Sequence, residues 1–88
     1  MAGRMGPALM TLRVELYGFL GEALGRQARL DFARRPRARE VLQALADRSG
    51  EAALLKGAVL ATEEEVLGGE DLVPLSGRLA ALPPVCGG

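Results

Sequence analysis

Apolar and polar residues alternate in two segments near the start of the chain. Three apolar residues alternate with polar ones over 11–17, and three more do so over 28–32. A period of two predicts half-buried strands, and their closeness in sequence favours antiparallel pairing. Between them, residues 19–24 predict a single helical turn, which Gly25 closes.

The period changes after residue 35. Over 36–48 the apolar residues recur at spacings of three and four, which predicts a helix with one apolar face. Pro36 suits the first turn of this helix, and Gly50 suits its end. Residues 51–56 predict a short further turn.

The last third of the chain reads as short strands separated by turns. Residues 58–62 predict a buried strand, and the acidic run 63–65 predicts a solvated turn. Residues 71–75 predict a short edge strand, because a proline such as Pro74 fits only at an edge or a bulge. Residues 78–82 predict the last strand.

The order of these elements predicts an α+β protein. One main helix must cover one face of a mixed sheet of about five strands, and the β-grasp (ubiquitin-like) fold is the natural arrangement. We expect a flexible N-terminal segment at 1–10, the β-grasp domain at 11–82 and a C-terminal tail at 83–88.

Composition narrows the possible functions. Of the 88 residues, 49% are hydrophobic and 25% charged, and the net charge of zero gives no general attraction to nucleic acid or to anionic membranes. The chain has no His and one Cys, which argues against a zinc site, a catalytic triad and a disulfide framework. No apolar run reaches the roughly 18 residues of a membrane span. We expect a cytoplasmic protein, with no metal site, that works through what it binds or what is attached to it.

Charge is unevenly distributed along the chain. Seven arginines lie within 26–48, and six acidic residues lie within 51–75. Two surfaces for partners of opposite charge and two merely solvated surfaces both fit this pattern.

The most informative segment is Pro83-Pro84-Val85-Cys86-Gly87-Gly88. Two terminal glycines arise by chance in well under about 1% of chains. The prolines stiffen the exit from the last strand, because each fixes φ and removes a donor. Gly87 and Gly88 then form an arm without side chains, which can enter a narrow channel and present its terminal carboxylate.

These C-terminal residues, following the Arg-Leu-Ala-Ala-Leu strand, resemble the small subunit of molybdopterin synthase, the MoaD type, among the ubiquitin-like sulfur carriers. The resemblance extends from about Leu12 to Gly88 and includes the 19–25 turn and the 37–48 helix. Three positions differ from the family pattern: Arg78 stands where Asp is frequent, Ala61-Thr62-Glu63 where Asn is frequent, and Cys86 where Ser, Thr or Ala is usual.

The resemblance implies a function for the tail. An E1-like adenylyltransferase would activate the Gly88 carboxylate with ATP and Mg²⁺, and a sulfur donor would convert it to a thiocarboxylate. The tail would then enter the large subunit of molybdopterin synthase, in a heterotetramer of two small and two large subunits, and give its sulfur to cyclic pyranopterin monophosphate. The chain would be a non-catalytic carrier subunit that binds no cofactor itself.

Several alternatives stay open. The sulfur acceptor could be thiamine, tRNA or the tungsten cofactor, or the protein could be a ubiquitin-like modifier or a plain interaction domain. Leu82, Val85 and Phe19 are candidate anchors for partner enzymes, together with Pro83, Pro84 and Cys86, although Leu82 also fits a core position. Cys86 could hold a persulfide or simply fill a slot for a small side chain.

Overall fold

The structure is a computed structural model that describes residues 9–84. Within this range the chain forms five strands, two α-helices and one 3₁₀ helix. In chain order they are β1 (Met10–Leu16), α1 (Phe19–Leu24), β2 (Gln27–Phe32), α2 (Ala38–Ser49), η1 (Ala52–Leu55), β3 (Val59–Ala61), β4 (Val66–Leu67) and β5 (Leu79–Leu82).

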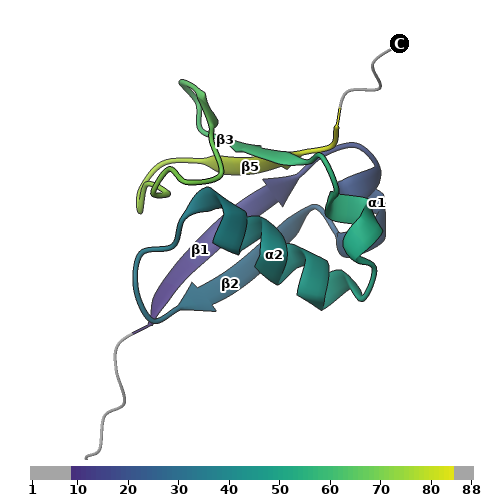
Figure 1. Cartoon of the computed structure of the whole chain (residues 1–88), viewed down its shortest axis with the longest axis horizontal. Helices are drawn as coiled ribbons and strands as arrows, with labels where there is room; N and C mark the ends of the chain where they lie inside the picture. Colours follow the sequence, from purple (N-terminus) through teal and green to yellow (C-terminus); the bar gives the residue numbers. More distant parts are fainter. Residues whose placement is uncertain (1–8, 85–88) are drawn as a thin grey trace, which may run out of the picture.

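The strands form one mixed sheet in the order β2-β1-β5-β3-β4. β1 pairs antiparallel with β2 and parallel with β5, while β3 pairs antiparallel with both β5 and β4. α2 lies across one face of this sheet (Figure 1). The predicted α+β arrangement, with one main helix on a five-stranded mixed sheet, is therefore confirmed.

The core lies between the sheet and α2. The alternation in β1 sends Leu12, Val14 and Leu16 to the helix side, where all three are buried. Val41 and Leu45 from α2 belong to the same hydrophobic core and are fully buried. Each such side chain contributes about 1.5–3 kcal/mol on leaving water, so this face holds most of the apolar stabilisation.

The ends of α2 are fixed by local signals. Arg37 is the N-cap, and its N–H donates to Oε1 of Glu40 at 2.7 Å. Gly50 follows the helix in the left-handed conformation with φ +76°, as the sequence predicted. Pro36, however, does not lie in the first turn: it precedes the N-cap, and its ring is fully buried. That part of the prediction is wrong.

The edge strand predicted at 71–75 is also wrong. Within this segment only Leu72 forms a bridge, an isolated one with Arg37, and the edge strand is instead β4. The reason is the burial of Val73: its side chain is fully enclosed, and its N–H donates to the Pro36 carbonyl at 2.9 Å. The segment is thereby held against the start of α2 and not along the sheet.

The other predicted elements are confirmed, with ends that differ by one or two residues. The turn at 19–24 is the short helix α1, followed by Gly25, and the acidic run 63–65 is an exposed bend between β3 and β4. Among the described residues, no helix has the length and apolar character needed to cross a membrane.

Candidate functional site

The exit of the chain from the sheet is the first feature of the candidate site. β5 lies between β1 and β3, and it ends at Leu82 because the next two residues, Pro83 and Pro84, have no N–H to donate. Both prolines are half-buried. They leave the sheet at the end where α1 and η1 lie (Figure 1). The predicted reactive residues Gly87 and Gly88, and the predicted contacts Val85 and Cys86, lie outside the described residues.

The sheet face opposite α2, here called the open face, carries an apolar stripe beside this exit. The stripe consists of Val59 and Ala61 from β3 and Ala80 and Leu82 from β5. Val59 is directly opposite Leu82, and Ala61 is opposite Ala80, so all four side chains share one face. All four are half-buried in the free protein, which leaves apolar area that a partner can cover.

A hydrogen-bonded polar cluster borders the apolar stripe. The Arg78 guanidinium donates to both carboxylate oxygens of Glu15, from Nε to Oε2 at 3.2 Å and from Nη2 to Oε1 at 3.0 Å. The Tyr17 hydroxyl donates to Oε1 of the same carboxylate at 2.7 Å. The polar cluster and the stripe meet around a shallow depression of about 230 Å³, which Glu15, Tyr17, Arg78, Ala61 and Ala80 help to line.

The polar cluster also shifts the protonation of its members. Hydrogen bonds from Arg78, and secondly from Tyr17, lower the pKa of Glu15. Donation to the Glu15 carboxylate raises the pKa of Tyr17. The carboxylate thus stays charged and accepts three hydrogen bonds within the chain, so a partner can cover it without leaving an unsatisfied buried acceptor.

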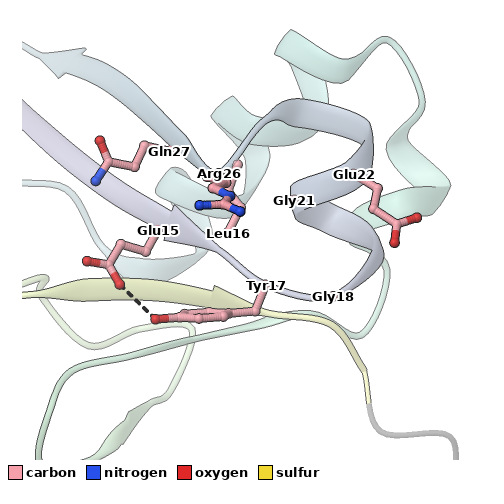
Figure 2. A pocket seen from close by; sticks show the side chains of 8 residues that line it. All are labelled: Glu15, Leu16, Tyr17, Gly18, Gly21, Glu22, Arg26 and Gln27. Atoms are coloured by element: carbon pink, nitrogen blue, oxygen red, sulfur yellow. Dashed lines mark hydrogen bonds between the residues drawn. The ribbon is translucent and has the colours of Figure 1, made fainter.

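A larger groove of about 510 Å³ lies between the end of β1, α1 and the start of β2. Figure 2 shows Tyr17 at the margin of this groove, with its hydroxyl directed toward Glu15. Arg26 lies beside Leu16 at the end of β1, because the Leu16 N–H donates to the Arg26 carbonyl. The groove borders the same exit, because Gly18 lines it and also contacts Pro83. The open face and this groove therefore form one continuous surface around the exit.

Four of the predicted site residues lie within the described part of the chain. Leu82 belongs to the apolar stripe, so it is neither a fully buried core residue nor freely exposed. Phe19 is the first residue of α1 and 43% exposed, next to Gly18 at the exit. Pro83 and Pro84 form the exit itself. The structure thus brings these four predicted residues to one end of the sheet.

Tyr17 is a site residue that the sequence reasoning missed. Its signal was present: it is the last outward residue of the first alternating segment and one of three aromatic residues in the chain. It is 45% exposed, and tyrosine is enriched at interfaces.

The basic and acidic segments partly pair with each other. The Arg39 guanidinium donates from Nε to Oε2 of Glu70 at 2.9 Å, and Arg37 Nη1 donates to the Glu70 carbonyl at 2.7 Å. These contacts join the start of α2 to the loop after β4. The charge asymmetry in the sequence is thus used, in part, for contacts within the chain.

The fold can be compared with known structures. The crystal structure of SAMP1 from Haloferax volcanii superposes with a TM-score of 0.67 at 22% sequence identity, over 89% of this chain and 99% of that chain. A crystal structure of H. volcanii small archaeal modifier protein 1 gives 0.67 at 21% identity, over 85% and 98% of the two chains. This similarity establishes the predicted ubiquitin-like β-grasp fold. No protein-family model matches the chain, and no curated protein matches it.

Proposed function

We propose that this protein is a ubiquitin-like sulfur carrier for molybdenum cofactor synthesis, which works through a thiocarboxylate at Gly88. The observation that carries the proposal is the exit: two half-buried prolines end a central strand beside an open face with a half-buried apolar stripe. A carrier needs both features, because a partner must hold the body while the end of the chain reaches a reaction centre.

The proposed chemistry begins at the carboxylate of Gly88. An oxygen of this carboxylate attacks the α-phosphorus of ATP, held with Mg²⁺ by an E1-like adenylyltransferase, and pyrophosphate leaves. A sulfur nucleophile then displaces AMP, so that a C–S bond replaces the activated C–O bond. Adenylation is required because a free carboxylate is a poor acyl donor.

In the second half of the proposed cycle the sulfur goes to cyclic pyranopterin monophosphate. The transfer takes place in the large subunit of molybdopterin synthase, and hydrolysis returns Gly88 to a carboxylate. The carrier supplies position and no acid or base, and such positioning is worth several orders of magnitude in rate. We propose that both partner enzymes bind the open face, with Leu82 at the exit end of the apolar stripe and Tyr17 and Phe19 near the same exit.

A second function, protein modification, is favoured by one specific observation. One of the structures similar to this chain is named a small archaeal modifier protein. A modifier uses the same adenylated carboxylate but joins it to an amine of another protein. Carriers for thiamine, tRNA or tungsten-cofactor synthesis share the activation step with the proposed function and differ in the acceptor.

Mass spectrometry of the protein isolated from cells tests the proposal. A carrier gains, on its C-terminal residue, the mass difference between one sulfur and one oxygen atom. A modifier is instead found attached through Gly88 to lysines of other proteins. If neither species forms when the activating enzyme, ATP and a sulfur donor are present, both functions are wrong. For a carrier that does form the thiocarboxylate, sulfur transfer to purified cyclic pyranopterin monophosphate distinguishes this acceptor from the others.

Two variants test whether the end of the chain carries the function. Deleting Gly87 and Gly88 removes the proposed reactive group, and adding one Ala after Gly88 moves the carboxylate by about 3.5 Å. We expect either change to lower sulfur transfer by a hundredfold or more. We expect the free energy of unfolding to change by no more than about 0.5 kcal/mol. Sulfur transfer retained in both variants would refute the carrier function.

A further inference from the structure

The registers of the two ladders beside β5 place a glycine next to each proline of the exit. Leu16 lies beside Ala81 in the parallel ladder with β1, and two residues further on Gly18 faces Pro83. In the antiparallel ladder, Val59 is opposite Leu82. Gly57, two residues before Val59, therefore faces Pro84, two residues after Leu82. The prolines are therefore flanked on both sides by residues without a side chain.

At these two glycines a methyl group would lie closer to a proline ring than an ordinary contact allows. A Cβ on Gly18 would lie 2.9 Å from Cγ of Pro83, and a Cβ on Gly57 would lie 3.0 Å from Cβ of Pro84. Both distances are below ordinary van der Waals contact, which starts near 3.4 Å. The proline rings thus rest directly on the glycine backbones, and a side chain at either glycine must push its ring away.

Backbone conformation alone does not account for this arrangement. Gly18 and Gly57 have φ of +59° and +80°, which favours glycine, but Gly50 and Gly77 also have positive φ, of +76° and +88°. A Cβ on Gly50 or on Gly77 would meet nothing within 4 Å. Gly18 and Gly57 differ from these two because each is also a contact surface for a proline.

We propose that Gly18 and Gly57 form a seat for Pro83 and Pro84 that sets the direction in which the C-terminal tail leaves the body. The two glycines are positioning residues, and their purpose rests on the proposed carrier function. Each proline has its own φ fixed by its ring, so holding both rings also fixes the position of the Pro84 carbonyl carbon, from which the tail continues.

The length of the tail makes this direction important. In the proposed carrier, the four residues from Val85 to Gly88 separate Pro84 from the reactive carboxylate, and four residues span at most about 14 Å when fully extended. A rotation of about 10° at the exit then displaces the end of an extended tail by about 2.5 Å. A misplacement of about 1 Å at a reaction centre can cost about a hundredfold in rate. A seat that limits rotation at the exit therefore has a large effect on delivery.

The direction of the tail can be measured without any enzyme assay. Cys86 is the only cysteine, so a nitroxide label reacts at one position in the tail, and the amide signals that it broadens report where the tail points. We compare Gly18→Ala and Gly57→Ala with Gly50→Ala, which imposes the same kind of backbone strain where no proline lies. We expect the broadening pattern to change in the first two variants and to stay as in the wild type in the third.

Compensating substitutions sharpen the test. Pro83→Ala removes the ring atoms nearest Gly18, so it should lower the melting temperature less in the Gly18→Ala background than in the wild type. Against Gly57→Ala the nearest atom is the Cβ of Pro84, so Pro84→Gly should compensate and Pro84→Ala should not. If a glycine variant fails to fold, the double variant Pro83→Ala/Pro84→Ala deletes the proline rings and keeps both glycines. We then expect the label at Cys86 to broaden a larger number of amide signals than in the wild type.

The functional arm uses sulfur transfer to purified synthase. We expect Gly18→Ala and Gly57→Ala to lower the rate of sulfur transfer at saturating carrier at least tenfold. The carrier concentration that gives half the maximal rate should change much less. Gly50→Ala should change neither. The seat would be refuted by an unchanged broadening pattern in both glycine variants, or by an equal change in Gly50→Ala, and neither result would bear on the carrier function. If the pattern changes but no thiocarboxylate forms, the seat is supported and the carrier function is refuted.

Discussion

The two faces of the sheet differ in what covers them, although the same strands build both. On the helix side Val14, Leu60 and Ala81 are fully buried beneath α2. On the open face their neighbours Val59, Ala80 and Leu82 are only half-buried. The first face has its apolar partner within the chain. The second keeps apolar area in contact with water, next to the exit of the tail, and this area is available to another protein.

The two faces also differ in whether they carry polar residues. In the described part of the chain, no polar or charged residue is buried. On the open face Arg78 and Tyr17 both donate hydrogen bonds to Glu15 at the border of the apolar stripe. One face is thus specialised for stability, and the other combines apolar area with polar groups that are already paired. Substitutions on the two faces should therefore affect different measurements.

The largest expected effect on stability comes from the helix side. Leu60→Ala removes a fully buried side chain and leaves a cavity beneath α2, so we expect a loss of about 2–5 kcal/mol in the free energy of unfolding. Leu82→Ala, on the neighbouring strand but on the open face, should cost about 1 kcal/mol. Urea denaturation measures both. Equal losses would contradict the division between the two faces.

The next effect concerns binding. Leu82→Asp places a charge at the exit end of the apolar stripe, and we expect the affinity for the activating enzyme and for the large synthase subunit to fall by about thirtyfold, as for a hot-spot residue. Leu72→Asp is the matched control, because Leu72 is 43% exposed but lies beside Arg37 at the start of α2. Calorimetric titration of the folded variants measures both. Equal losses in the two variants would show that the open face is not the binding surface.

The helix side was largely predictable from the sequence, because its signals are local and periodic. Alternation in residues 11–17, helical spacing in residues 36–48 and Gly50 at the helix end each correspond to an observed element. The wrong edge strand at 71–75 has a long-range cause: the burial of Val73 against Pro36 cannot be read from the residues around Val73.

The open face was only partly predictable. Alternation indicates that Leu82 and Leu79 point to opposite faces, but it does not say which face α2 covers, so the sequence allows Leu82 both in the core and at the surface. In the sequence, a glycine that follows an alternating segment, as Gly18 does, indicates only that a strand ends there. Its contact with Pro83 depends on the parallel pairing of β1 with β5, which joins the two ends of the domain and leaves no local pattern.

The smallest effect is expected in the polar cluster of the open face, and its pH dependence follows from the direction of the shifts. The pKa of Glu15 is lowered in the folded protein, so the hydrogen bonds of its carboxylate contribute to stability above the pKa of the unfolded state. This contribution is lost as the pH falls through the folded pKa. The pKa of Tyr17 is raised, so its contribution is present below the unfolded pKa and is lost as the pH rises through the folded one. Between these two limits the cluster should be fully formed.

The order of the causes gives a test at single-residue level. Arg78 lowers the pKa of Glu15 more than Tyr17 does, because its guanidinium donates to both carboxylate oxygens. We therefore expect Arg78→Gln to raise the Glu15 pKa toward its usual value by more than Tyr17→Phe does, as measured by the carboxyl carbon shift in an NMR titration. Neither variant should change the midpoint of thermal unfolding at neutral pH by more than a small amount, since pairs this exposed contribute little. A larger rise in Tyr17→Phe would mean that the hydroxyl, and not the guanidinium, holds the carboxylate charged on the open face.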